Sequence, residues 1–374
     1  MIICKNCVMD ETDPNIKFDE NGVCNHCRNY YSNISQIWKN DGKNEDKLKI
    51  LSANIKKETK NSEFNCILGI SGGVDSSYLA YYTKEILGLN PLIFHVDAGW
   101  NSELAVSNIE NVINNLNLEL FTEVINWQEM QDLQLAYFKS GVPCLDTPQD
   151  HVFFASMYEF AVKNNIKYIF NGGNFSTECI REPLEWHYHA SDLKHLKTIH
   201  SKFGKIKLDT LPTSDIFKYK IYYKYFKGIK VIQPLNYIKY IKEDAVSLLK
   251  KKLNWKEYKY KHYESRFTRF YEGYWLIEKF GYDKRKAHLS SLILTNQITR
   301  EEALNKINIK PFNADEIRED FSYISKKLGI TESELKELFD MKNKSFKDYK
   351  SNHKLIQFFI SLSRILKLER RIIQ

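Results

Sequence analysis

The sequence predicts an α/β fold, in which a doubly wound, mostly parallel sheet follows a cysteine-rich N-terminal module and precedes a helical C-terminal region. Three observations predict it. Short apolar runs alternate with helix-length segments between residues 64 and 170, which is the pattern of parallel strands joined by right-handed crossovers. A Ser-Gly-Gly turn joins the first apolar run to the first helix. Beyond residue 180 the alternation stops, and the chain becomes helical, aromatic and basic.

The predicted elements follow one another from residue 64. We expect strands at residues 64–70, 91–96, 118–125 and 166–170, with 230–234 rejoining the sheet. We expect helices at 76–87, which Gly88 would end, and at 102–116, 127–139, 151–164, 314–341 (broken at Gly329) and 353–373. This gives four predicted units: a metal module at 1–30, a helical linker at 31–62, the sheet domain at 63–240, and a helical substrate- or partner-binding region at 241–374.

The composition limits the classes of protein that fit. The chain has 374 residues, of which 43% are hydrophobic, so a large core is expected and wholesale disorder is excluded. Its net charge of +8 favours an anionic partner, such as a nucleotide, a sugar nucleotide or RNA. We find no signal peptide and no apolar run of the roughly 18 residues that a membrane span requires. We therefore expect a cytoplasmic protein, whose cysteines are metal ligands or free thiols rather than disulfides.

Four cysteines near the N-terminus predict a metal site. Cys4 and Cys7 form one Cys-x-x-Cys pair, and Cys24 and Cys27 form a second. Two such pairs supply the four thiolates of a tetrahedral site, which indicates zinc. Because the protein would fill all four positions, the zinc should be structural rather than catalytic. An iron–sulfur cluster and a redox pair are the alternatives.

The turn after the first strand predicts a phosphate site. Adjacent glycines let the backbone approach an anion, and the N–H groups at the start of a helix point toward it. The serines add hydroxyl donors, and the aspartate either caps the helix or holds Mg²⁺. No Gly-Lys-Ser/Thr follows, so this is not the loop that transfers a γ-phosphate. The residues of this phosphate loop are Ser71, Gly72, Gly73, Val74, Asp75, Ser76 and Ser77.

Other candidates follow later strands, whose carboxyl ends meet at one edge of the sheet. Val96 and Asp97 end the second strand and are expected near the nucleotide, where Asp97 would either contact the ribose or stabilise the loop. Gly172 and Gly173 end the fourth and are expected to approach nucleotide or substrate. Polar and charged residues further along the chain are weaker candidates for contacts with substrate phosphates or carboxylates: Asn174, Glu178, Arg181, Arg266, Arg269, Lys284 and Arg285. His187 and His189 are candidate acid–base groups.

The phosphate loop resembles the PP-loop of the adenine-nucleotide alpha-hydrolase-like superfamily, whose members cleave ATP between the α- and β-phosphates. Further motifs, at residues 4–14, 18–27, 95–102, 265–268 and 280–291, resemble the N-acetyl sugar amidotransferase family of surface-polysaccharide pathways. The resemblance implies that ATP, with Mg²⁺, adenylylates an N-acetyl oxygen on a nucleotide-activated sugar. Ammonia then displaces AMP and leaves an acetamidino group. It also implies a separate glutaminase that supplies ammonia, with a cyclase-like subunit as a possible conduit. We expect Ser71, Asp75, Ser76 and Arg181 to be the catalytic residues.

Two alternatives remain open from the sequence. A tRNA-modifying PP-loop enzyme, either a thiolase or a lysidine-type ligase, would explain the metal module and the positive charge, and Cys144 and Cys179 could then carry sulfur. The sugar-family motifs favour a partner other than nucleic acid. A zinc scaffold without catalytic activity is the second alternative, and the complete Ser-Gly-Gly-Val-Asp-Ser loop argues against it.

Overall fold

A computed structural model of the chain describes residues 2–259 and 263–365. Its centre is a five-stranded sheet with all neighbouring strands parallel, in the spatial order β3-β2-β1-β4-β5. From β1 to β3 the chain adds each new strand on one side of β1. From β4 onward it adds strands on the other side of β1. The topological switch point therefore lies between β1 and β4. The predicted fold class is confirmed. The strands are β1 (Cys66–Gly69), β2 (Pro91–Asp97), β3 (Glu119–Val124), β4 (Tyr168–Phe170) and β5 (Lys230–Ile232).

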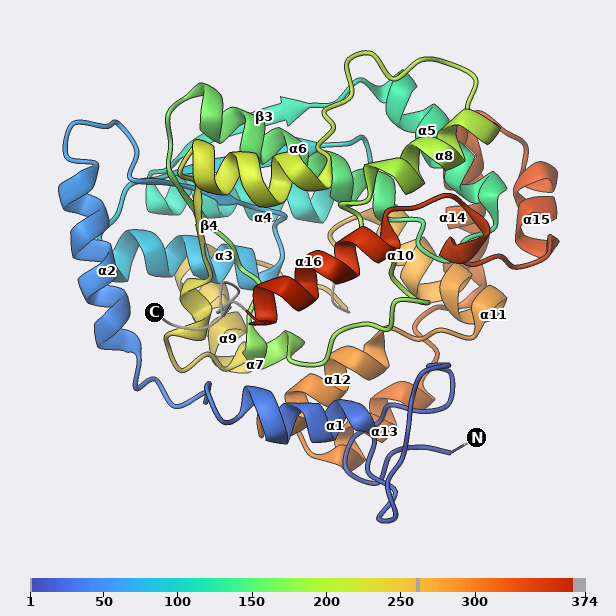
Figure 1. The fold of residues 1–374 in the computed structure, drawn as a ribbon, viewed down its shortest axis with the longest axis horizontal. Helices are drawn as coiled ribbons and strands as arrows, with labels where there is room; N and C mark the ends of the chain where they lie inside the picture. Colours follow the sequence, from blue (N-terminus) through green and yellow to red (C-terminus); the bar gives the residue numbers. More distant parts are fainter. Residues whose placement is uncertain (1, 260–262, 366–374) are drawn as a thin grey trace.

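Helices cover both faces of the sheet (Figure 1). Because side chains alternate along a strand, Cys66 and Leu68 enter one hydrophobic cluster, whereas Ile67 enters the other. The two layers leave the carboxyl edge of the sheet as the place where a ligand can reach the ends of the strands. The first cluster includes residues of α2 (Glu45–Glu58), α3 (Val74–Tyr81), α4 (Glu103–Leu116) and α9 (Lys242–Leu253). The second includes residues of α5 (Trp127–Ser140), α6 (Thr147–Lys163) and α8 (Leu193–Phe203).

Two predicted elements differ from the structure in an informative way. Helix α6 begins at Thr147 rather than at residue 151, because Pro148 fits the first helical turn, where its missing N–H needs no partner. Helix α2, within the predicted linker, contributes the fully buried Leu48 and Ile55 to the same cluster as Leu68 of β1. The segment before the sheet is therefore part of its core, and the four predicted domain limits stay predictions.

Several short helical segments connect the larger ones. Helix α3 continues directly into the π-helical segment η2 (Tyr82–Ile86), and Gly88 follows at φ +58, where the sequence predicts a stop. The other short segments before residue 282 are α1 (Asn25–Asn29), η1 (Tyr30–Ile34), α7 (Phe175–Glu178), η3 (Lys218–Phe226), η4 (Pro234–Asn236), α10 (Arg266–Phe270), η5 (Tyr271–Trp275) and α11 (Leu276–Phe280).

The C-terminal region is helical, as predicted. It comprises α12 (Arg285–Leu294), α13 (Arg300–Asn308), α14 (Ala314–Leu328), α15 (Glu332–Asp340), η6 (Phe346–Asp348) and α16 (His353–Ile365). Gly329, with φ +70, ends α14 at the predicted break. The end of the helix predicted at 353–373 lies outside the described residues. In the ranges that the structure describes, no helix is both long enough and apolar enough to cross a bilayer.

Candidate active site

The phosphate loop lies between β1 and α3, at the switch point of the sheet. Gly72 has φ +83, and a Cβ there would lie 2.9 Å from the carbonyl oxygen of Ala105, so the position requires glycine. The Ser76 hydroxyl donates to the Gly73 carbonyl over 3.2 Å and accepts from the Ser71 N–H over 3.3 Å. These bonds hold hydroxyls and N–H groups at the positive end of α3, which is an arrangement suited to an anion.

Asp75 lies in the first turn of α3, but it is not the N-cap residue of this helix. The N-cap residue is Gly73. Oδ1 of Asp75 instead accepts the hydroxyl proton of Tyr240 over 2.5 Å. Burial, together with the Asp75 carboxylate, raises the pKa of Tyr240 well above its ordinary value, so the phenol stays a donor. Of the two roles expected for Asp75, helix capping is therefore wrong, and binding of Mg²⁺ stays a prediction.

The loop after β4 contacts the phosphate loop. A Cβ at Gly172 would lie 3.3 Å from the backbone nitrogen of Ser76. The Gly173 N–H donates to the side chain of Asn171 over 2.6 Å, and the side chain of Asn174 caps α7. The two glycines therefore lie at the expected edge of the sheet. Their contact with nucleotide stays a prediction.

Hydrogen bonds of the Asp97 and His95 side chains stabilise the end of β2. Oδ1 of Asp97 accepts the Gly99 N–H over 2.8 Å, so Asp97 stabilises the turn that follows the strand. The side-chain amide of Asn101 donates to Nε2 of His95 over 2.9 Å. The other ring nitrogen of His95 therefore carries the proton and donates to the Ile70 carbonyl over 2.9 Å. His95 links the end of β1 to the residues after β2, a role that sequence reasoning missed.

Glu264 is a further residue at this site that the sequence did not reveal. The Ser71 hydroxyl donates to Oε1 of Glu264 over 3.1 Å, and the Glu264 carbonyl accepts the Ser102 N–H over 3.0 Å. The indole N–H of Trp255 donates to the Gly72 carbonyl over 2.9 Å. The C-terminal region therefore reaches the phosphate loop and places a carboxylate beside it. The only signal in the sequence was the position of Glu264 immediately before the Ser-Arg-Phe-Thr motif.

Arg266 and Arg269 lie close to one buried carboxylate. Both guanidinium groups pair with Asp320, which is 1% exposed, and their Nε atoms lie 3.0 and 3.1 Å from its oxygens. Arg266 also stacks on the ring of Tyr323, at 4.0 Å from the ring centroid. Both arginines thus orient α10 against α14. Their expected contact with a substrate anion stays a prediction.

Lys284 lies at the centre of a buried group of charges. Its Nζ is 2.9 Å from Glu272, 3.1 Å from Glu182 and 3.9 Å from Asp146. Burial alone would lower the pKa of Lys284, but the carboxylates of Glu182 and Glu272 hold it well above its ordinary value. Burial also raises the pKa of Asp146 well above its ordinary value, despite the opposing lysine. We call Asp146, Glu182, Glu272 and Lys284 the charge cluster.

The buried polar atoms of this region that have no hydrogen-bond partner within the described chain include Oδ1 of Asp146 and the hydroxyl of Tyr271. The Tyr271 ring lies 5.3 Å from the ammonium of Lys284. Toward solvent the cluster continues through His187, which lies 3.7 Å from Glu182 and 3.6 Å from Asp150. Buried polar atoms are normally paired, so these two suit a bound polar molecule.

The charge cluster lies on the same edge of the sheet as the phosphate loop. Helix α6 leads into β4, so its N-terminus, with Asp146 and Thr147, points to the carboxyl edge. Further along α6, Met157 packs against Gly69 at the end of β1. Its sulfur would lie 3.4 Å from a Cβ added to Gly69. Ten residues of helix separate Met157 from Thr147, which corresponds to about 15 Å. One extended substrate could therefore reach both places.

Two of the remaining predicted substrate residues come from the segment after β4, and a third, Arg285, lies beside the end of α13. Arg181 and Glu178 are exposed and come from the segment after β4, and Oε2 of Glu178 would lie 3.6 Å from a Cβ on Gly173. Arg285 instead pairs with Asp283 and donates to three backbone carbonyls at the end of α13. Burial lowers the pKa of His189 to about 4, so this histidine is neutral at pH 7. The expected roles of these residues stay predictions.

The four N-terminal cysteines converge as expected. Their sulfur atoms all lie within 4.8 Å of one another, and all four residues are buried. Backbone N–H groups point at the sulfurs, among them Met9 to Cys7 at 3.4 Å and Cys24 to Cys4 at 3.2 Å. Such bonds stabilise thiolates, so the donor set suits a soft, tetrahedral metal ion. The cluster can hold a metal, and its identity as zinc stays a prediction.

This metal module is fixed to the body of the protein beside α12 and α13 (Figure 1). The Arg300 guanidinium donates to the carbonyls of Cys4 and Cys7 over 2.8 to 3.1 Å. The indole N–H of Trp186 donates to the Thr12 carbonyl over 3.2 Å. Because Trp186 follows Glu182 closely in the chain, the module also supports the segment that supplies the charge cluster.

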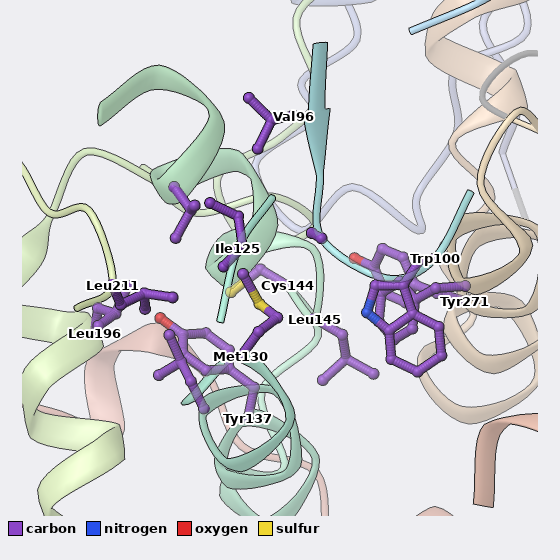
Figure 2. Packing of buried hydrophobic residues seen from close by; sticks show 14 of the residues in the cluster. Val96, Trp100, Ile125, Met130, Tyr137, Cys144, Leu145, Leu196, Leu211 and Tyr271 are labelled. Carbon is purple, nitrogen blue, oxygen red and sulfur yellow. The ribbon is translucent and has the colours of Figure 1, made fainter. Parts of the chain in front are cut away.

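The other cysteines are buried thiols. Figure 2 shows Cys144 among apolar side chains that include Met130 and Leu145, and it is 1% exposed. Burial raises the pKa of Cys144, and it raises that of Cys179 to about 12. Because thiolates are the reactive form, neither residue is prepared for sulfur transfer in this conformation.

Two family models match the chain. The model described as "LPS biosynthesis protein WbpG-like, C-terminal domain" matches residues 264–363. The model described as "NAD synthase" matches residues 47–139, which include β1, the phosphate loop and β2. No curated protein is matched. The boundary of the first match falls at Glu264, so the contact of Glu264 with Ser71 joins the two matched regions.

The chain is similar to many solved structures, and three of them illustrate the level of similarity. The NH₃-dependent NAD synthetase from Campylobacter jejuni is 15% identical, with a TM-score of 0.29, over 80% of this chain and 98% of that one. The NMN synthetase from Francisella tularensis is 14% identical, with a TM-score of 0.34, over 80% and 97%. The U34-tRNA thiolase NcsA from Methanococcus maripaludis, with its [4Fe-4S] cluster, is 14% identical, with a TM-score of 0.33, over 92% and 90%.

A Ser-Gly-Gly-x-Asp-Ser loop at the switch point of a parallel sheet, inside a region matched by the NAD synthase model, defines an ATP-using, ligase-type enzyme of the PP-loop class. A WbpG-like domain follows in the same chain. The two matches together support the N-acetyl sugar amidotransferase family of the PP-loop superfamily, and a sugar-related amidotransferase within it.

Proposed function

We propose that the protein uses ATP to adenylylate the N-acetyl oxygen of a nucleotide-activated sugar, and that ammonia then replaces this oxygen to give an acetamidino sugar for surface glycans. The observation that carries the proposal is the hydrogen bond between Ser71 and Glu264. It brings the ATP-using loop and the WbpG-like domain into one site. If the second domain were an unrelated accessory domain, it would not need to place a residue, here Glu264, against the phosphate loop.

The phosphate loop would hold the pyrophosphate that leaves. The backbone N–H groups at the start of α3 and the hydroxyls of Ser71 and Ser76 would stabilise the negative charge that develops on it. Val96 and Asp97, on the neighbouring strand, would face the adenosine. Asp75 and Glu264 supply carboxylate oxygens, the ligands that Mg²⁺ prefers. When bound, Mg²⁺ would neutralise charge on the phosphates.

The sugar would extend from the phosphate loop toward the charge cluster. In the first step, the acetamido oxygen attacks the α-phosphorus of ATP, and the bond from that phosphorus to the bridging oxygen breaks. The electron pair leaves with pyrophosphate. Arg181, exposed at the same edge, would pair with a phosphate of the substrate. The unpaired atoms of Asp146 and Tyr271 would accept or donate hydrogen bonds to the polar substrate.

In the second step, ammonia adds to the activated carbon through its lone pair. The carbon–oxygen bond to AMP breaks, AMP leaves with that electron pair, and a proton from nitrogen is released. His187, which lies between Glu182 and Asp150, would take this proton. The ammonia would come from a partner glutaminase, with a cyclase-like subunit as conduit, as in the family. The four N-terminal cysteines would hold a structural Zn²⁺ away from the chemistry.

A substrate panel tests the proposal. The protein is incubated with ATP, Mg²⁺, ammonium chloride and a set of nucleotide-activated N-acetyl sugars, and the products are separated by mass. We expect AMP and pyrophosphate together with a sugar in which NH has replaced O. Formation of ADP and phosphate would contradict the proposed cleavage. AMP formation that depends on added tRNA, but not on any sugar, would favour the RNA-modifying alternative.

A further inference from the structure

The positive charge of the chain is concentrated in one segment. Residues 193–230 contain ten lysines and two aspartates, with no arginine and no glutamate. Their net charge of +8 equals that of the whole chain, so the remainder of the protein is neutral on balance. A charge excess confined to a tenth of the sequence indicates a surface that meets an anion, and this segment lies outside the candidate active site.

The same segment exposes aromatic side chains. Around η3 the exposed fractions are 52% for Phe217, 39% for Tyr222, 57% for Tyr225 and 77% for Phe226. Large apolar side chains that gather at a surface usually mark a place of interaction. Lys224 and Lys227 are exposed within this group. We call these six residues the aromatic–lysine surface.

The aromatic–lysine surface continues onto neighbouring elements. Phe217, Tyr222 and Phe226 line an open hollow of about 650 Å³. A second hollow shares Asp215 with the first and is lined by Lys194 and Lys197 of α8. The surface therefore adjoins a further basic strip.

Helix α16 borders the other side. It lies across the front of the molecule in Figure 1. The ring of Phe359 packs at 5.9 Å from that of Phe217, and the neighbouring Phe358 is 59% exposed. Apolar side chains from two elements thus form one face, with lysines around it.

The type of cation and the aromatic residues distinguish among anionic partners. Protein interfaces are depleted in lysine and enriched in arginine, and arginine is also the residue that pairs with nucleic-acid phosphates through two hydrogen bonds. This segment has lysine alone. Exposed aromatic rings among lysines are instead typical of elements that lie on an anionic bilayer, where rings enter the headgroup region and lysines meet the lipid charge. We propose that the aromatic–lysine surface binds the surface of an anionic phospholipid membrane.

Vesicle flotation with the full-length protein tests this proposal. Vesicles of phosphatidylglycerol mixed with phosphatidylcholine are compared with vesicles of phosphatidylcholine alone. We expect flotation only with the anionic vesicles, and we expect added salt to weaken it. The double variants Tyr225→Ser/Phe226→Ser and Lys224→Glu/Lys227→Glu should each lower partitioning by at least roughly tenfold, since each basic residue near the surface contributes several-fold.

Matched controls make the test specific. Val124→Ser/Ile309→Ser removes two apolar side chains that are 72% and 61% exposed elsewhere, and Lys251→Glu/Lys252→Glu makes the same charge change on α9. Both controls should float like the unchanged protein. Absence of flotation, equal flotation with neutral vesicles, or equal loss in the controls would overturn the proposal. So would binding of an RNA homopolymer through these residues without any flotation.

Discussion

The hydroxyl of Ser71 donates to a carboxylate oxygen of Glu264 over 3.1 Å, across 193 positions of sequence. Ser71 opens the phosphate loop, and Glu264 is the first residue matched by the WbpG-like domain. A carboxylate beside phosphates repels them unless a cation lies between, so this contact predicts a metal-dependent role for Glu264 in handling ATP.

Glu264→Gln tests that role. The amide keeps the hydrogen bond with Ser71 but loses the charge, so the Mg²⁺ concentration for half-maximal rate should rise. The value of kcat/KM for ATP should fall by about 100-fold or more, which corresponds to the loss of one charged contact in a transition state. The matched control is Glu257→Gln, which removes an exposed carboxylate paired with Lys250. If both variants depend on the Mg²⁺ concentration in the same way, Glu264 has no metal-dependent role in handling ATP.

Gly172→Ala tests whether the two loops at the switch point must touch. The new methyl group would lie 3.3 Å from the Ser76 backbone nitrogen, so the loops must separate. We expect the KM for ATP to rise by about tenfold or more, because small displacements at a site are costly to alignment. The free energy of unfolding should fall by roughly 1 to 3 kcal/mol.

Gly281→Ala is the control for this change. A Cβ there meets nothing within 4 Å, but the residue has φ +75. It should lose roughly 1 to 2 kcal/mol of stability and keep the KM for ATP. A higher KM in the Gly281 variant than in the Gly172 variant would show that stability, not loop contact, determines nucleotide binding.

The fold could be predicted from the sequence because its signals are local. An apolar run before Ser-Gly-Gly defines β1, and Gly88 and Gly329 end helices where the backbone turns left-handed. Thr147 as the start of α6 was missed, although Pro148 is itself a start signal. The burial of α2 was missed because its polar sequence carries only a narrow apolar stripe.

The site could be predicted only in part, because its other residues depend on distant contacts. The phosphate loop and the four cysteines form sequence motifs. Glu264 and Tyr240 reach Ser71 and Asp75 only after folding, so no spacing reveals them. The sequence predicts Lys284 only as a weak candidate for a contact with substrate, whereas the structure buries it among three carboxylates from separate segments.

Metal analysis tests the cysteine cluster. We expect one Zn²⁺ per chain, no visible absorption of an iron–sulfur cluster, and loss of the metal in Cys27→Ser. Because the metal module holds Trp186 and α13 in place, its removal should lower the free energy of unfolding by about 3 kcal/mol or more. Cys144→Ser should keep the metal. Iron and sulfide in the purified protein, or full zinc content in Cys27→Ser, would contradict the assignment.

His195 predicts a pH dependence of stability. Burial lowers its pKa from 6.5 to about 4 in the folded protein, and neither ring nitrogen has a hydrogen-bond partner among the described residues. The unfolded chain therefore binds a proton that the folded protein excludes. This contribution, about 3 kcal/mol, is present above pH 6.5 and is lost as the pH falls toward 4.

Denaturant unfolding of the unchanged protein and of His195→Phe, at several pH values, measures this contribution. The phenyl ring suits the aromatic surroundings formed by Tyr137, Tyr188 and Tyr349. The variant should lose less stability between pH 6.5 and 4 than the unchanged protein. If the free energy of unfolding changes with pH equally in the two proteins, the pKa of His195 does not differ between the folded and unfolded states.

Cys144→Ser separates nitrogen transfer from sulfur transfer. A buried, protonated thiol has no part in the proposed reaction, so the rate per folded molecule should stay within about twofold, with a modest loss of stability of roughly 1 to 2 kcal/mol. Loss of turnover in a variant that remains folded, as judged by circular dichroism, would support sulfur chemistry instead.

The most direct measurement follows one oxygen atom. A nucleotide-activated sugar that is a substrate is prepared with a heavy-oxygen label in its N-acetyl carbonyl, and the reaction is run with unlabelled ATP and ammonium. If the acetyl oxygen attacks the α-phosphorus, the label must appear in AMP, and the pyrophosphate must remain light. Light AMP, with the label in the product or in water, would contradict adenylylation of the N-acetyl group.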